Sequence, residues 1–224
     1  MHAVARVEVE AGGRFTVLRG AAPLLPRRTG PGEIHFVGGA AGPLGGDRLR
    51  IELSVGPSAF LLVRTVAASI ALPGPSGDLS RLEVHASVAR GGRLVWLPEP
   101  LIATARCRHE VLSTVELAEG AELLWREELI GGRMGEPAGD ARLWTSVTRA
   151  GRPWYVGELS VGPSAPGWAG PAVLGSARAY ASVLSTSDGA TGPGIMELAG
   201  GGVLGVALGD DLPDVRHALV ALCS

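Results

Sequence analysis

The side chains best suited to chemistry in this sequence are carboxylates placed beside glycine or proline. Asp47 follows a glycine-rich stretch, Glu99 lies between two prolines in the run 97–100, and Glu127 closes a strand-like segment that begins at Ala121. Acids at strand ends can gather at one edge of a sheet, where they form an oxygen-rich path for a divalent cation or a glycosidase-type acid/base pair. The alternative for each acid is a cap or an ion pair with arginine.

Asp47 is the strongest of these three candidates. Five glycines and one proline occupy the nine residues from Gly38 to Gly46, which frees the backbone for positive φ and for close approach to another surface. The chain then passes directly into an alternating strand at 48–55. A loop this unusual favours a function for the acid that ends it.

A second candidate site is the Cys107-Arg108-His109 segment. A thiolate and an imidazole are both ligands for transition metals, and residues i and i+2 of a strand share one face. The same spacing also describes an ordinary strand residue and its neighbour, which is the favoured interpretation. The other cysteine, Cys223, has no nearby C-x-x-C partner, and two cysteines are too few for a disulfide framework.

Several function classes are excluded by residues that the sequence lacks. All 20 basic residues are arginine, so neither a Walker A phosphate loop nor a lysine Schiff base is available. No G-x-S-x-G or H-E-x-x-H motif is present. The formal charge of −2 gives no footprint for nucleic acid or an anionic membrane. The most apolar stretch, 59–72, is too short to span a bilayer. The sequence starts without a charged n-region followed by an apolar h-region, so we expect a cytoplasmic protein.

The elements that must position these side chains are repeated pairs of strands. Alternating segments joined by glycine turns recur along residues 1–161, with first strands at 5–10, 48–55, 81–88, 110–117 and 142–148. The later units recur about every 30 residues, a spacing typical of solenoids and β-arrays. We therefore predict one all-β domain over residues 1–224, built from β-hairpin units in a stacked or β-helical array. An antiparallel sandwich is the alternative.

Residues 162–224 have a different texture, with loops, weaker strands and one helix. Strands are expected at 177–184 and 201–208. The run Asp210-Asp211-Leu212-Pro213 is a helix-start signal, and apolar residues follow it at helical spacing. This terminal segment is the one helix that the sequence predicts.

Taken in order, these motifs resemble the urease accessory proteins of the UreD/UreH family. The resemblance rests on Gly45-Gly46-Asp47-Arg48-Leu49, Leu97-Pro98-Glu99-Pro100-Leu101-Ile102, Leu124-Trp125-Arg126-Glu127 and the ending Leu208-Gly209-Asp210-Asp211. It covers most of the chain. The segment after Thr65 departs from the family pattern, because the polar segment there lacks a lysine and an aromatic residue.

The resemblance implies a non-enzymatic scaffold with a β-helical fold. Such a protein would bind apo-urease, a helical urease accessory protein and a nickel-carrying GTPase, and would hold no permanent cofactor while nickel passes through it. By this resemblance Asp47, Glu99 and Glu127 would line the nickel path. Isolated carboxylates suit transit, because tight N/S coordination would trap the ion.

Two other functions remain open from the residues alone. One is a β-solenoid enzyme that acts on a polysaccharide with Asp47 and a second acid, and the other is a structural β-array that binds only protein. No His or Tyr stands beside Asp47 in the sequence to complete an acid/base set, so the scaffold is preferred.

Overall fold

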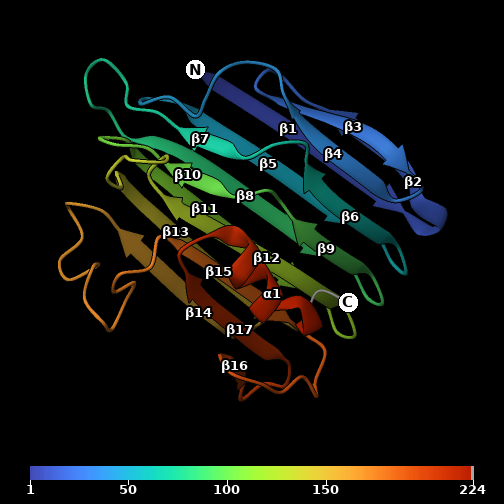
Figure 1. The fold of residues 1–224 in the computed structure, drawn as a ribbon. Helices are drawn as coiled ribbons and strands as arrows, with labels where there is room; N and C mark the ends of the chain where they lie inside the picture. Colours follow the sequence, from blue (N-terminus) through green and yellow to red (C-terminus); the bar gives the residue numbers. More distant parts are fainter. Residues whose placement is uncertain (223–224) are drawn as a thin grey trace.

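A computed structural model describes residues 1–222 as two stacked β-sheets with one short helix outside them (Figure 1). The first sheet has the strand order β14-β13-β11-β8-β5-β1-β2. Its strands are β1 (His2–Glu10), β2 (Arg14–Arg19), β5 (Arg48–Val55), β8 (Ser80–Val88), β11 (Arg108–Leu117), β13 (Asp140–Arg149) and β14 (Arg152–Val161). We call it sheet A.

The other sheet, sheet B, has the order β16-β17-β15-β12-β9-β6-β4-β3, and β7 and β10 extend it beside β12. Its strands are β3 (Leu24–Gly30), β4 (Glu33–Gly38), β6 (Phe60–Thr65), β7 (Ser69–Ala71), β9 (Arg93–Leu97), β10 (Leu101–Ala103), β12 (Glu122–Gly131), β15 (Ala179–Ser185), β16 (Ile195–Glu197) and β17 (Val203–Gly209). The helical segments are η1 (Ala11–Gly13), α1 (Leu212–Ala218) and η2 (Val220–Leu222).

The all-β class, the stacked array and the short terminal helix are confirmed. Successive repeats stack in parallel: β1, β5, β8, β11 and β13 pair side by side in sheet A, and β4, β6, β9 and β12 do so in sheet B. In the middle of the array the repeated unit is not the β-hairpin that the sequence predicts. In the three middle repeats the two strands belong to different sheets, so the glycine turn is a corner between layers.

Within residues 1–222, hairpins occur only at the ends of the stack. The pairs β1/β2 and β13/β14 are antiparallel, as the sequence predicts for the first and last units. In the middle repeats the corner turns place Gly91 and Gly120 at positive φ, which explains why glycine recurs at this point of each unit. The physical reason for the corner is that both strands of a unit carry an inward apolar face, and closing two layers on one another buries both.

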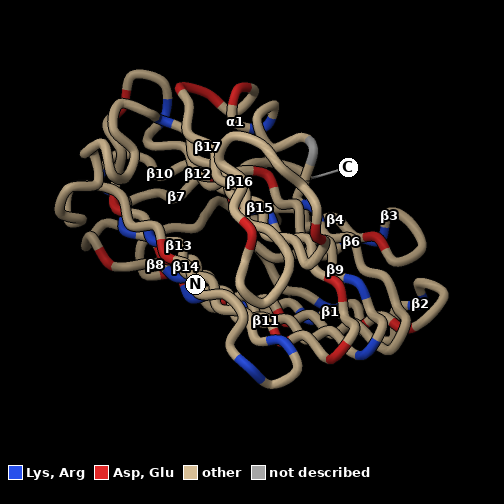
Figure 2. The backbone as a smooth tube through the Cα atoms, turned by 90° about the horizontal axis from the view of Figure 1, so that it is seen from below, with Lys and Arg blue, Asp and Glu red and all other residues tan. Residues whose placement is uncertain are grey.

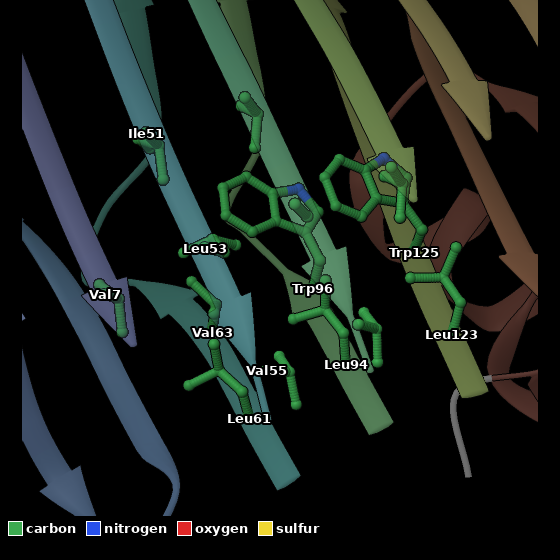
Figure 3. Close-up of a cluster of buried hydrophobic side chains, with 14 of the residues drawn as sticks. Val7, Ile51, Leu53, Val55, Leu61, Val63, Leu94, Trp96, Leu123 and Trp125 are labelled. Carbon is green, nitrogen blue, oxygen red and sulfur yellow. The ribbon is translucent and has the colours of Figure 1, made fainter. Parts of the chain in front are cut away.

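The space between the sheets holds two separate apolar clusters. The larger one contains residues such as Leu53, Leu61 and Leu94, and includes Trp96 and Trp125, whose rings stack with centroids 4.9 Å apart (Figure 3). Such stacking is worth about 0.5–1.5 kcal/mol beyond the buried area. The second cluster lies around β10, β13 and β7. The interior is therefore apolar at both ends and not continuous between them.

Helix α1 covers the outer face of sheet B, on the side of β15 and β17 that faces away from sheet A (Figure 2). Val215 of the helix and Leu219 directly after it belong there to a third apolar cluster, which also contains Leu124 of β12 and Val183 of β15. The helix begins as the sequence predicts, because the Asp211 carboxylate caps it by accepting a hydrogen bond from the Asp214 N–H. No helix within residues 1–222 is long and apolar enough to cross a membrane.

Candidate functional site

Sheet B contains an opening at the point where β12 stops pairing with β9 and has not yet begun to pair with β10. Strand β12 pairs with β9 only as far as Trp125 and with β10 only from Leu129 onward. Between those points the segment 126–128 is paired on one side only, with β15. Two short segments outside the strands lie on the other side of the opening: residues 66–68 connect β6 to β7, and residues 98–100 connect β9 to β10. We call this opening the window.

A cavity of about 180 Å³ lies at the window. Its lining includes members of both inner clusters, such as Trp96 and Leu143, and also residues at the outer face of sheet B, including Pro98, Glu99 and Glu128. The cavity therefore extends from the space between the sheets to the two acids that contact Arg216 of α1. Members of both inner clusters border it.

The inner wall of the cavity is polar near Glu127 and Ser113, and His109 of β11 is a further polar lining residue. Glu127 lines it from β12, and its Oε1 accepts a hydrogen bond of 2.6 Å from the Thr145 hydroxyl of β13. Ser113, adjacent to Thr145 across β11 and β13, lines the cavity with a hydroxyl that has no hydrogen-bond partner within the described residues. Burial raises the pKa of the Glu127 carboxyl, and the hydroxyl of Thr145 and the indole of Trp125 oppose that rise.

The outer mouth of the window carries a cluster of two acids and two arginines. Glu128, whose side chain has no exposed surface, binds Arg216 of α1 through two hydrogen bonds of 2.6 and 2.7 Å. The same guanidinium reaches Glu99 at 2.9 Å, and Arg126 Nε lies 3.3 Å from Glu128. Bidentate arginine–carboxylate pairs of this kind are strong and fixed in direction. These four side chains, Glu99, Glu128, Arg126 and Arg216, form the mouth cluster.

The predicted acids are thus divided between three places. Glu127 lies inside the cavity and Glu99 at its mouth, whereas Asp47 is not among the lining residues in the described part of the chain. Asp47 is 3% exposed; its carboxylate accepts hydrogen bonds from the Leu44 N–H at 2.9 Å and the Met1 ammonium at 2.7 Å. It ends the glycine loop and directly precedes β5, whose residues Leu49 and Ile51 line the cavity.

Cys107 and His109 are both buried, on the inward side of sheet A. The Nδ1 of His109 lies 2.8 Å from the Ser80 hydroxyl, and burial lowers the pKa of this imidazole to about 4. Burial raises the pKa of the Cys107 thiol to about 11. Within residues 1–222, no three His, Cys, Asp or Glu side chains converge as a metal cluster, and Cys223 lies outside the described residues.

Sequence reasoning missed Glu128 and Arg216 as members of the site. Strand alternation contains part of the signal: Glu127 and Glu128 are consecutive in β12, so they face opposite sides of sheet B, one inward and one toward α1. The partner of Glu128 is 88 residues away in the chain, and no local pattern reveals such a contact. Arg216 in the sequence is simply a basic residue in the last turn of a helix.

The fold and the site define a class of protein: a two-layer, mainly parallel β-scaffold that holds a small cavity lined by three glutamates among apolar residues. The model of the UreD urease accessory protein family matches residues 3–222. The chain is 42% identical to the urease accessory protein UreD of Parafrankia sp. (strain EAN1pec), over 98% of this chain and 86% of that protein.

Two further relatives agree with this match over nearly their whole lengths. Identity is 38% with the urease accessory protein UreD of Frankia alni, over 99% of this chain and 91% of that protein. It is 37% with the UreD protein of Streptomyces coelicolor, over 98% and 94% of the two chains. The chain belongs to the UreD family of urease accessory proteins, as the resemblance of its motifs predicts.

Proposed function

We propose that this protein is a non-enzymatic scaffold in the cytoplasm that delivers nickel to apo-urease, with the window as the path of the ion. The observation that carries the proposal is the cavity that joins the acid Glu127 between the sheets to the acids at the mouth. The partners that the function requires are apo-urease, a helical urease accessory protein and a nickel-carrying GTPase.

The chemistry of the cavity suits an ion in transit. Single carboxylate and hydroxyl oxygens bind Ni²⁺ weakly compared with sites of several imidazoles or thiolates, so an ion can leave as readily as it enters. Glu127 and Ser113 supply such oxygens in the cavity, the Thr145 hydroxyl donates a hydrogen bond to Glu127, and residues of the two apolar clusters form the walls on either side. An aqueous ion moving between two apolar clusters needs a polar layer of this kind.

The polysaccharide enzyme is less well supported. Ligand pockets for molecules of drug size usually measure about 300–1,000 Å³, and a cavity of about 180 Å³ is small for a glycosidic bond with a sugar on each side. Asp47, which that hypothesis makes the first catalytic acid, is buried and bound to the Leu44 N–H. Glu99, a possible second acid, is already paired with Arg216.

The test combines recovery of partners with nickel transfer. Tagged protein is expressed in a host whose own UreD-type gene is deleted, and both bound proteins and bound nickel are measured, together with urease activity at limiting nickel. The parent is expected to recover urease subunits and the GTPase. Glu127→Gln is expected to recover the same proteins while urease activity and its nickel content fall.

A matched control is available on the outer face of sheet A. Glu158 is a glutamate of sheet A that is paired with Arg142 at 2.8 Å and lies on β14, away from the window. Glu158→Gln should activate urease like the parent. The proposal is contradicted if Glu127→Gln also does so, or if the parent recovers no urease subunit. An Asp47→Ala variant that loses turnover of a sugar would restore the enzyme hypothesis.

A further inference from the structure

Arg216 occupies an unusual position for a residue on a surface helix. Its guanidinium lies at the outer mouth of the window and contacts two acids from separate parts of sheet B, Glu99 at 2.9 Å and Glu128 at 2.6 Å. Both acids also line the cavity. Anything that passes between the cavity and the surface at this point must pass the acids that Arg216 holds.

The mouth cluster is neutral only while Arg216 is in place. Its formal charges are two negative, from Glu99 and Glu128, and two positive, from Arg126 and Arg216. With Arg216 removed, two carboxylates face one guanidinium, and the mouth carries a net charge of −1. Since attraction of a cation scales with the net charge nearby, the cluster is indifferent to cations when Arg216 is bound and attractive to them when it is not.

Arg216 is also the cation of the cluster that is able to leave. The Arg216 and Glu99 side chains are 35% and 36% exposed, whereas Arg126 is 13% exposed and the Glu128 side chain has no exposed surface. A guanidinium with a free solvent side can rotate outward at the cost of its hydrogen bonds, while a carboxylate inside the sheet cannot follow it. The pKa of Arg216 is raised by its two acid partners, so it stays charged in either position.

We propose that Arg216 is a removable counter-ion: it neutralises Glu99 and Glu128 at the mouth of the window, and a metal cation enters or leaves there only when Arg216 swings into solvent. This inference rests on the proposed passage of nickel through the window. It adds a residue outside the cavity, on α1, that decides when the passage accepts a cation. A partner that binds the outer side of α1 would then control the passage by drawing Arg216 away.

The test uses tryptophan fluorescence of the isolated full chain. Trp96 lines the cavity and stacks on Trp125, so quenching of this pair reports on ions inside. The other three tryptophans are first replaced by phenylalanine, at positions Trp144, Trp154 and Trp168. Stern–Volmer constants are then measured with Ni²⁺, a paramagnetic cationic quencher, and with acrylamide, a neutral quencher of similar reach.

The Arg216→Gln variant is expected to raise the Ni²⁺ quenching constant about 3-fold or more, the change that one unit charge about 7 Å away produces for even a monovalent ion in water. The acrylamide constant should stay near that of the parent. The matched control is Arg142→Gln, which removes a guanidinium paired with Glu158 and Glu110 on sheet A and should change neither constant.

A second variant keeps the test decisive if Arg216→Gln folds poorly. Arg216→Lys retains the positive charge but cannot bridge both acids in two directions, and a smaller rise in the Ni²⁺ constant is expected. No rise in either variant overturns the inference, as does an equal rise with acrylamide, which would indicate general loosening. The quenching test does not depend on urease activation. The role of Arg216 can therefore be refuted while Glu127→Gln still abolishes nickel delivery, and the proposed function can be refuted while Arg216→Gln still raises the Ni²⁺ constant.

Discussion

Replacing His109 with glutamine should remove a large part of the acid sensitivity of this fold. The imidazole is 2% exposed and its Nδ1 lies 2.8 Å from the Ser80 hydroxyl. Burial lowers its pKa from 6.5 to about 4, with Ser80 and Asp47 opposing the shift only in part. Glutamine is close in size, offers hydrogen-bonding groups to Ser80, and carries no titrating proton.

The sign and the size follow from linkage. Between about pH 4 and pH 6.5 the unfolded chain binds a proton at His109 that the folded chain does not, so the free energy of unfolding decreases as the pH falls through this range. The difference of about 2.5 pKa units, at 1.36 kcal/mol for each unit, corresponds to about 3 kcal/mol. Above pH 6.5 the imidazole is neutral in both states and contributes no pH dependence.

Urea unfolding of the parent and of His109→Gln at pH 8 and pH 4.5 measures this quantity. The free energy of unfolding of the parent minus that of the variant should be lower at pH 4.5 than at pH 8 by about 2–3 kcal/mol, because pH 4.5 lies near the lower end of the interval between the two pKa values of His109. Taking the difference cancels the other titrating groups, including Glu127. An equal difference at both pH values would refute the reasoning and indicate an imidazole that is protonated, or reached by water, in the folded state.

Three other substitutions test the site. Glu127→Gln should be more stable than the parent at pH 7. The pKa of Glu127 is raised in the folded protein, so ionisation of this carboxyl favours the unfolded chain at any pH above the pKa that it has there, and the difference in stability should close toward pH 4. A parent that is more stable than the variant at pH 7 contradicts this. Arg216→Ala should lower the free energy of unfolding by about 3 kcal/mol, because the buried Glu128 loses its bidentate partner and keeps only Arg126, and Arg216→Leu with Glu128→Leu should recover most of this loss in urea titrations. Gly157→Ala should lower the melting temperature, at a cost of about 1–3 kcal/mol, since its Cβ would overlap the Tyr155 hydroxyl; an unchanged value would mean that this ring moves freely.

Much of the fold was accessible from periodicity. Period-two alternation located the strands of the repeats, and Asp211 with Pro213 located the start of α1. The short strands β7 and β10 were not predicted, because three residues are too few to show a period-two pattern. These two strands border the window, so the part of the fold that matters most to the site was the part with the weakest local signal.

The hairpin interpretation shows a limit of a different kind. The turn at Gly91–Gly92 looks like a hairpin turn, yet β8 and β9 lie in different sheets. A two-residue glycine turn is compatible with either outcome, and the choice depends on where each strand finds its neighbours. Here the neighbours are equivalent strands about 30 residues away, which pair in parallel.

The sequence by itself determined the class of the chain, the stacking of its repeats, its terminal helix and the family to which it belongs, since all of these depend on local periodicity and short ordered motifs. Only the tertiary structure decided which acids share a cavity. It placed Glu127 inside the window and Glu99 with Glu128 at its mouth, and kept Asp47 apart in its own loop. Contacts such as Glu99–Arg216, 117 residues apart, arise from the packing of a helix on a sheet, and no spacing in the sequence encodes them.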